Sequence, residues 1–236
     1  MEQLGPHVRR AELMWSTMLP RQATLSLLPV TADPERWSRL DPRERSLLGP
    51  GCTERRRHEF SAGRGCAQAA MAALGVPAEP VFWNRHGAPI WPAGTVGSIS
   101  HSRTLAGAAV APRAAIRALG IDLEADVPLS HDVRSLVLTE DDLRVNSVIP
   151  ESMLSWSTLV FSAKEAVHKA CYPLVHTPLE FRDTTIRIIP RRHCGNGSFT
   201  AYLRVGDEVD RTVPRQMSGT WHRDAGHFFS ACWIQV

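Results

Sequence analysis

Gly120-Ile-Asp-Leu-Glu124, near the middle of the 236-residue chain, alternates aliphatic and acidic side chains. Successive side chains of a β-strand point to opposite faces, so the alternation predicts a strand over residues 119–124 whose aliphatic members enter the core. Asp122 and Glu124 then project together from the other face. Like charges held side by side repel one another, and a bound cation is a natural reason to keep this pair together.

A second informative stretch is Phe161-Ser-Ala-Lys-Glu-Ala-Val-His-Lys-Ala170, which holds the only two lysines among the chain's 27 basic residues. Nucleotide composition can explain why lysine is rare, but not why Lys164 and Lys169 flank one carboxylate, Glu165. A lysine ammonium is a compact point charge and an arginine is a planar fork, so the two are not equivalent beside a crowded phosphate or metal centre. On a predicted helix over residues 153–172, Glu165 and Lys169 are four apart and could face one site. The alternative is an ordinary surface ion pair, worth about 0.3–0.5 kcal/mol.

Glu165 would add a third carboxylate to the pair on the strand. A small set of oxygen ligands, with positions left for water and phosphate, favours Mg²⁺ over zinc, and Mn²⁺ suits the same ligands. The sequence therefore predicts a metal site at Asp122, Glu124 and Glu165.

A third motif, Gly97-Ser-Ile-Ser-His-Ser102, places a glycine before alternating hydroxyls and a histidine at the end of a predicted strand. Small residues let the backbone approach a phosphate closely, and Ser100 and His101 can donate hydrogen bonds to it. A lone histidine near a strand end is more often structural, however. The glycine spacing matches neither a Walker A loop nor a dinucleotide-binding loop.

The remaining pattern predicts an α+β fold with antiparallel sheets rather than a doubly wound parallel sheet. Helices are expected at residues 8–19, 53–74, 130–138 and 153–172, the last ended by Pro173. Strands are expected at residues 23–30, 96–101, 105–110, 119–124, 185–189, 199–205, 219–222 and 228–234, and a loop is expected at residues 83–94. No linker composition appears, so we expect two domains, residues 1–119 and 120–236, that share an interface near Gly120.

Composition excludes several classes of protein. The first ten residues lack the apolar segment of a signal peptide, and no apolar run reaches transmembrane length. The five scattered cysteines, Cys52, Cys66, Cys171, Cys194 and Cys232, indicate reduced thiols in the cytoplasm rather than disulfides or a zinc site. A net charge of +3 does not indicate nucleic-acid binding, and the basic residues at 55–58 and 64 suit a solvated helix face. We expect a cytoplasmic monomer that binds neither membrane nor nucleic acid.

Taken together and in this order, the motifs resemble the 4′-phosphopantetheinyl transferases of the larger Sfp/EntD type. The composition, rich in arginine and alanine, resembles that of actinobacterial members. The matching pieces are Gly97–His101, Gly120–Glu124 and Phe161–Lys169, supported by Arg56–Phe60 with Gly63, Arg64 and Cys66, and by Gly87–Pro92. The match runs from about residue 50 to residue 190, and five motifs in sequence are far more specific than any one of them.

The resemblance implies two similar α/β halves related by a pseudo-twofold axis, each with a small antiparallel sheet and a long helix, and a coenzyme A cleft between them. It implies Mg²⁺-dependent transfer of the phosphopantetheine arm from coenzyme A to a serine of an apo carrier domain, with release of adenosine 3′,5′-bisphosphate. The acceptors in this class are acyl and peptidyl carrier domains of fatty acid, polyketide and nonribosomal peptide synthases, siderophore pathways included.

The resemblance also implies roles for individual residues. Residues 1–119 would hold the 3′-phosphate and pyrophosphate, and residues 120–236 the metal and the catalytic helix. Glu165 would take the serine proton, and Lys169 and His101 would stabilise phosphate oxygens. Arg56, Arg64, Ser100, Asp122, Lys164, Lys169 and one of Arg85 and His86 would complete the coenzyme A contacts. His168 departs from the aromatic or aliphatic residue usual before the second lysine, and Arg85 and His86 stand where a lysine is common.

Two rival hypotheses remain. A metal-dependent phosphohydrolase or nuclease could use the same carboxylates, but it would have no reason for the Gly97–Ser102 loop or the upstream basic cluster. A catalytically silent module that binds carrier domains would have no need of Asp122, Glu124, Glu165 and Lys169.

Overall fold

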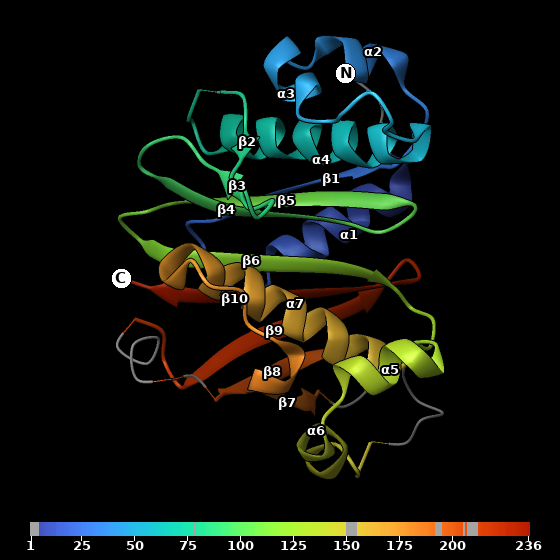
Figure 1. Cartoon of the computed structure of the whole chain (residues 1–236), viewed down its shortest axis with the longest axis vertical. Coiled ribbons are helices and arrows are strands. Elements are labelled where there is room, and N and C mark those ends of the chain that lie inside the picture. The colour runs from blue at the N-terminus through green and yellow to red at the C-terminus, as the bar shows by residue number, and fades with distance from the viewer. Residues whose placement is uncertain (1–4, 78, 150–154, 192–194, 205, 207–211) are drawn as a thin grey trace. The chain divides into compact units, whose positions relative to one another are not determined.

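The computed structural model describes residues 5–77, 79–149, 155–191, 195–204, 206 and 212–236. The chain divides into two compact units, residues 1–119 with Val236, and residues 120–235 (Figure 1). Each unit pairs an antiparallel sheet with one long helix, as expected from the sequence. The predicted pseudo-twofold relation stays a prediction.

The first unit contains a three-stranded sheet in the order β1-β5-β4, covered by the long helix α4. A short hairpin, β2 with β3, precedes β4. The elements are α1 (Pro6–Ser16), β1 (Thr24–Pro29), α2 (Pro34–Arg39), α3 (Pro42–Ser46), α4 (Glu54–Ala73), β2 (Phe82–Trp83), β3 (Pro89–Ile90), β4 (Thr95–His101) and β5 (Leu105–Pro112).

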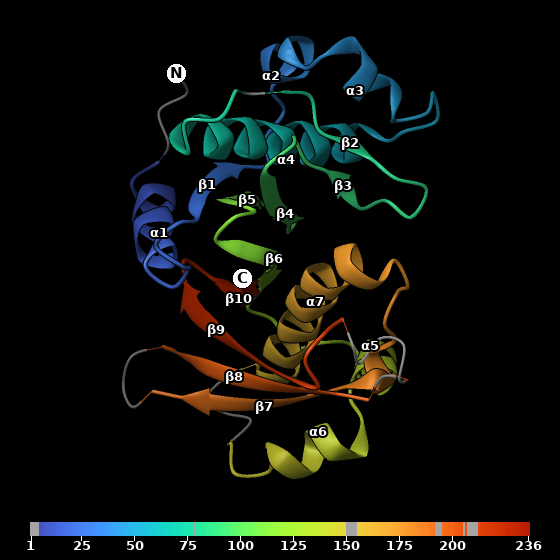
Figure 2. The ribbon, with the colours of Figure 1, turned by 90° about the vertical axis from the view of Figure 1, so that its left-hand side faces the viewer.

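Helix α4 begins where the sequence indicates, because the Thr53 hydroxyl accepts a hydrogen bond from the Arg56 amide at 3.2 Å. Phe60, Ala67 and Met71 form its buried stripe. Alanines and glycines in its second half let the helix lie close to β1 and β5, so that its first half, with the arginines, is carried on a rigid base. Figure 2 shows α4 lying across the strands of its sheet.

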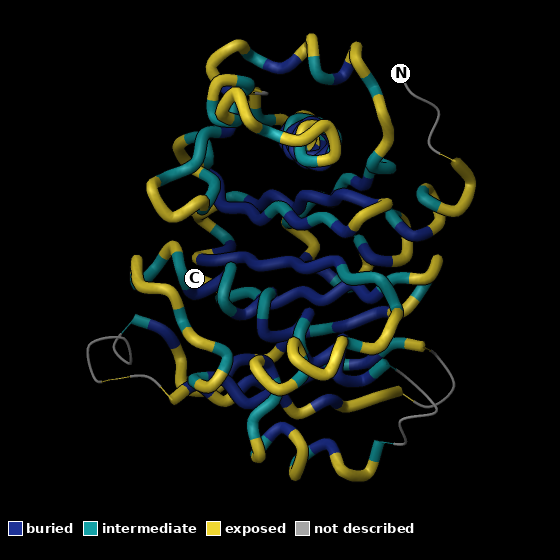
Figure 3. Tube along the Cα trace, turned by 45° about the vertical axis from the view of Figure 1, so that its right-hand side comes forward, coloured by how far each residue is buried: buried dark blue, intermediate teal, exposed yellow. Residues whose placement is uncertain are grey.

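The second unit contains the sheet β6-β10-β9-β8-β7, covered by α7. Its elements are β6 (Ile116–Ala125), which begins before the boundary between the units, α5 (His131–Val137), α6 (Glu140–Val145), α7 (Trp156–Val175), the 3₁₀ turn η1 (Phe181–Asp183), β7 (Thr184–Pro190), β8 (Asn196–Leu203), β9 (Gln216–Asp224) and β10 (His227–Gln235). The strands are buried along much of their length in both units (Figure 3).

Gly120 sets how closely β6 approaches α7. A β-carbon added at Gly120 would clash with the carbonyl oxygen of Ala166 and would lie 2.6 Å from the amide nitrogen of Ala170. Only glycine therefore fits at this contact. Ala166 and Ala170 directly follow Glu165 and Lys169, so the contact fixes the acidic strand against the helix that carries these two side chains.

Two sequence expectations were wrong in detail. Pro173 does not end α7: the helix continues to Val175 and ends at His176, whose φ of 54° lies in the left-handed region. A proline in the last turn removes one hydrogen bond only, which the end of a helix tolerates better than its middle. The expected loop at residues 83–94 contains the β2–β3 hairpin, because the side chain of Asn84 accepts hydrogen bonds from the amides of His86 and Ala88.

Three expectations fall partly outside the described residues: the start of the helix at Met153, the end of the strand at Val205, and Cys194. The helix is described from Trp156. The four described cysteines, Cys52, Cys66, Cys171 and Cys232, are free thiols.

Candidate active site

The second unit brings the predicted acidic residues and Lys169 together. Asp122, on β6, is 2% exposed, and its Oδ1 accepts a hydrogen bond from Lys169 Nζ at 2.6 Å. Lys169 belongs to α7, so this ion pair joins the strand to the helix across the close contact at Gly120. The ammonium that the sequence pairs with Glu165 therefore lies against Asp122.

Glu124 and Glu165 complete an acidic group around this ion pair. Burial, together with the charges of Asp122 and Glu165, raises the pKa of Glu124 to about 8, against the opposing effect of Lys169. Burial also raises the pKa of the Glu165 carboxyl, and the charge of Asp122 raises it further. Three carboxylates thus influence one another, and Lys169 is the cation that offsets them in both cases.

The carboxyl groups of Asp122, Glu124 and Glu165 influence one another, but their side chains do not converge as metal ligands. Among the described residues, no three His, Cys, Asp or Glu side chains are arranged to hold a metal ion. The donor chemistry nevertheless fits a hard cation, because three carboxyl groups share one ammonium and burial, together with repulsion from Asp122 and Glu165, raises the pKa of Glu124. The predicted metal site stays a proposal.

Lys164, one of the predicted coenzyme A contacts, is engaged inside the fold of the second unit. Its side chain is fully buried, and Nζ donates to Asp142 Oδ2 at 2.6 Å and to the carbonyls of Val137 and Phe181 at 2.8 Å each. All three ammonium protons are therefore used inside the fold. The sequence alone does not find this pair because Asp142 lies on α6, a separate short helix.

Asp142 also accepts hydrogen bonds from the N-cap of α6 and from β7. Its Oδ1 accepts the Ile186 amide at 2.7 Å, and its Oδ2 accepts the amide and hydroxyl of Thr139. The Lys164–Asp142 pair thereby ties α7 to α6 and β7, and it anchors the helix that carries Glu165 and Lys169.

His168 is another inward residue of α7. Its ring stacks on Phe181 with 5.4 Å between centroids, and Nε2 lies 3.3 Å from the Thr184 hydroxyl. Burial lowers the pKa of His168 to about 4, so the ring is neutral at neutral pH. It fills the role of the aromatic residue that is usual at this position.

The first unit gathers the predicted cationic residues around a cavity of about 120 Å³. Arg56 Nη1 lies 2.9 Å from His101 Nε2, and Glu59 lies near both, with Oε2 at 3.8 Å from Arg56 and 3.9 Å from His101. Because a guanidinium only donates, His101 Nε2 accepts this hydrogen bond. Glu59 was not among the predicted site residues, although its position, three after Arg56 and four after Arg55, places it on the same face of the helix.

Arg64 lines the same cavity from deeper in the fold. Its guanidinium lies over Phe60, 4.5 Å from the ring centroid, and 5.7 Å from that of Trp83. Its Nε is 3.5 Å from Glu44 Oε1. Burial lowers the pKa of Arg64 to about 10, which leaves it charged at neutral pH.

Three further predicted coenzyme A contacts of the first unit, Ser100, Arg85 and His86, are not among the residues that line the cavity. Ser100 is buried on β4. Arg85 and His86 are exposed at the tip of the β2–β3 hairpin, where Arg85 Nε donates to His86 Nε2 at 2.9 Å. Trp83, Gly87 and Pro89 of that hairpin do line the cavity.

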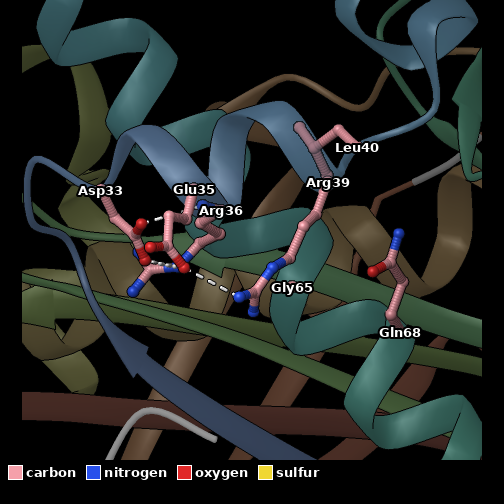
Figure 4. A pocket seen from close by; sticks show the side chains of 7 residues that line it. All are labelled: Asp33, Glu35, Arg36, Arg39, Leu40, Gly65 and Gln68. Carbon is pink, nitrogen blue, oxygen red and sulfur yellow. Dashed lines mark hydrogen bonds and ion pairs between the residues drawn. The ribbon is translucent and has the colours of Figure 1, made fainter.

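A larger cavity, about 470 Å³, lies between α2 and α4 (Figure 4). Each of its two arginines pairs with an acidic residue of α2 or of the N-cap of that helix. Arg39 Nη2 is 2.8 Å from Glu35, and Arg36 Nε is 3.4 Å from Asp33. Its charges are thus balanced locally.

Two family models match the chain. The N-terminal domain of 4′-phosphopantetheinyl transferase matches residues 44–111, and the 4′-phosphopantetheinyl transferase superfamily model matches residues 118–209. The chain is 37% identical to the 4′-phosphopantetheinyl transferase Svp of Streptomyces mobaraensis, over 83% of this chain and 78% of that protein. The chain belongs to the 4′-phosphopantetheinyl transferase superfamily.

Two other relatives carry the same enzyme name. The chain is 32% identical to PptT of Mycobacterium tuberculosis, over 80% of this chain and 84% of PptT, and 35% identical to Npt of Nocardia iowensis, over 76% and 82%. The chain is therefore a transferase of phosphopantetheine, and its family and its relation to actinobacterial members are confirmed. In the part of the chain that is described, no helix combines the length and apolar character needed to span a bilayer.

Proposed function

We propose that this phosphopantetheinyl transferase moves the 4′-phosphopantetheine arm of coenzyme A to a serine hydroxyl of apo acyl or peptidyl carrier domains, in a reaction that depends on Mg²⁺. The serine oxygen attacks the phosphorus that bears the pantetheine. The bond between this phosphorus and the bridging oxygen breaks, and adenosine 3′,5′-bisphosphate leaves. The observation that carries the proposal is the meeting of Asp122, Glu124, Glu165 and Lys169 on two elements of one unit.

Glu165 is the residue that takes the proton of the attacking serine. It stands on α7, which the Lys164–Asp142 pair and the Gly120 contact hold in place. A carboxylate on an anchored helix keeps its position as the oxygen–phosphorus bond forms, which is what general base catalysis requires.

Asp122, Glu124 and Glu165 are the residues that would hold Mg²⁺. A Mg²⁺ ion held there would supply positive charge against the negative charge that builds up on the leaving group. Lys169, which is 29% exposed beside Asp122, can then direct its ammonium at a phosphate oxygen.

The cavity of the first unit supports the coenzyme A part of the proposal. Arg56, His101 and Arg64 line it, and they offer donors to a phosphate group. We assign the 3′-phosphate to Arg56 and Arg64. Trp83 and Phe60 supply apolar walls beside it.

The test is to incubate the protein with coenzyme A, Mg²⁺ and an apo carrier domain and to weigh the carrier by mass spectrometry. A gain of one phosphopantetheine arm, absent when EDTA replaces Mg²⁺, is expected. Cleavage of coenzyme A with an unmodified carrier would indicate a phosphohydrolase, and an unmodified complex with the carrier would indicate a binding module. Either result would contradict the proposal.

A further inference from the structure

One ion pair of the first unit has unused hydrogen-bonding capacity. Glu44 is fully buried and Arg64 is 5% exposed. Glu44 Oε2, Arg64 Nε and Arg64 Nη2 are buried atoms that have no hydrogen-bond partner among the described residues. The closest approach of the two groups, 3.5 Å between Arg64 Nε and Glu44 Oε1, is too long for a good hydrogen bond.

The carboxylate of this pair is fixed by the backbone. Glu44 Oε1 accepts the amide of Val81 at 2.8 Å, one residue before β2. Helix α3, which carries Glu44, is capped by Asp41, whose side chain accepts a hydrogen bond from the Arg43 amide. Glu44 thus links α3 to the Val81 backbone and to Arg64 on α4.

The guanidinium is held on its other sides by aromatic rings. Phe60 lies under it at 4.5 Å, and Trp83 at 5.7 Å. Since Phe60 is one turn before Arg64 on α4, the helix itself sets the stacking. The rings and Glu44 together fix the plane of the guanidinium but use few of its donors.

A buried arginine that served packing alone would be expected to have its donors satisfied, because leaving charged donors without acceptors in a buried place is costly. Arg64 instead lines the cavity that also presents Arg56 and His101. Burial lowers the pKa of Arg64 and raises the pKa of Glu44, so burial disfavours the charged form of each group. An anionic ligand group at the cavity would accept the unused donors.

We propose that Glu44 is a positioning residue for coenzyme A: it holds the Arg64 guanidinium against Phe60 and Trp83, with its remaining donors available to the 3′-phosphate. This inference rests on the proposed function, which assigns that phosphate to Arg56 and Arg64. Glu44 acts through Arg64 and does not touch the ligand. It therefore contributes to the preference for coenzyme A over dephospho-coenzyme A, which lacks the 3′-phosphate.

The experiment compares E44Q with wild type, using coenzyme A and dephospho-coenzyme A as donors for an apo carrier. Glutamine keeps an acceptor for the Val81 amide but removes the charge that holds Arg64. The KM for coenzyme A is expected to rise about tenfold, the loss typical of one charge-assisted hydrogen bond, whereas kcat and the KM for dephospho-coenzyme A change less than about twofold. The matched control is E35Q, whose carboxylate is 79% exposed and pairs with Arg39; it should resemble wild type with both donors.

Equal weakening with both donors, or a KM for coenzyme A that stays unchanged or falls, would overturn the inference. If E44Q does not fold, F60L takes its place, because it removes the ring that lies under the guanidinium. F60L should raise the KM for coenzyme A and leave the KM for dephospho-coenzyme A nearly unchanged. An equal rise of both KM values in F60L would overturn the inference. Binding of both donors is also measured by calorimetry without carrier. Wild type that binds but does not transfer would then contradict the proposed function, whereas E44Q that keeps the wild-type preference between donors would contradict the role of Glu44.

Discussion

The cationic cavity of the first unit and the acidic group of the second unit hold charge in opposite ways. In the cavity, each arginine lies beside a carboxylate: Glu59, which also contacts Arg55, is near Arg56, and Glu44 is near Arg64. In the acidic group, Asp122, Glu124 and Glu165 share Lys169. The first arrangement is nearly neutral and orients donors. The second has more carboxyl groups than cations, and a further cation would stabilise the ionised carboxylates.

From this difference we propose separate tasks for the two regions. A set of oriented donors with balanced charge suits binding of a phosphate that does not react. An acidic group with one ammonium suits a metal-assisted transfer. Substitutions can therefore abolish the function of one region at a time, or remove the contacts that stabilise its structure.

The largest effect is expected for E165Q. Replacing the carboxylate by an amide removes the proton acceptor, so kcat should fall about 10²–10⁴-fold while the fold is kept. The measurement is the rate of carrier modification by mass spectrometry, with circular dichroism as the check on folding. E140Q, an exposed glutamate at the start of α6, is the control and should turn over normally. Undiminished turnover by E165Q would remove Glu165 from the mechanism.

The next effect concerns the anchor of α7. K164M and D142N should each lower the free energy of unfolding by about 3–5 kcal/mol, because each leaves a charge buried without its partner. The double variant should cost less than the sum of the two by about 1–3 kcal/mol. Urea unfolding measures both quantities. Additive losses, or normal stability of K164M with a raised KM for coenzyme A, would contradict the structural role of Lys164.

A smaller effect is expected for G120A. The added methyl group meets the backbone of α7 at Ala166 and Ala170, so the helix must shift, at a cost of about 1–3 kcal/mol in unfolding free energy. Transfer should fall as well, because the shift moves Glu165 and Lys169 relative to Asp122. G49A is the control, since no atom of the described residues lies within 4 Å of its added β-carbon. An active, fully stable G120A would show that the close contact is not needed.

The smallest effect is a pH dependence at His168. Burial lowers the pKa of His168 from 6.5 to about 4 in the folded chain. The contribution of the neutral ring to the free energy of unfolding is therefore fully present above pH 6.5. It is lost as the pH falls from 6.5 through about 4, because the unfolded chain binds the proton more readily. H168F keeps a ring on Phe181 and removes the titration. Thermal unfolding at several pH values should therefore show a shallower acid loss for H168F than for wild type. H131F, at a position 94% exposed, should follow wild type; equal slopes for all three proteins would contradict the assignment.

The sequence predicted the parts of the site that depend on local spacing. Alternation placed Asp122 and Glu124 on β6, and a four-residue interval placed Glu165 and Lys169 on one helix. Partners distant in sequence were not predictable in this way. Lys169 pairs with Asp122, 47 residues away, and Lys164 with Asp142, 22 residues away. Tertiary packing, which no local pattern encodes, decided which lysine faces the site.

The same limit applies to the first unit and to element ends. Thr53 and the buried stripe of α4 agreed with capping and periodicity, so that helix was predicted well. Glu44, 20 residues before Arg64, gave no local signal, because it lies on a helix of five residues. Pro173 was interpreted as a stop by its usual rule, but a helix can carry a proline in its last turn, where few hydrogen bonds remain to be lost.

Steady-state kinetics of E165Q and R56A, each with coenzyme A and with dephospho-coenzyme A, test most directly whether the two regions have separate tasks. E165Q should lose kcat with both donors. R56A should raise the KM for coenzyme A, with little change for dephospho-coenzyme A. Loss of kcat by R56A with both donors, or a loss by E165Q confined to the KM for coenzyme A, would contradict the account.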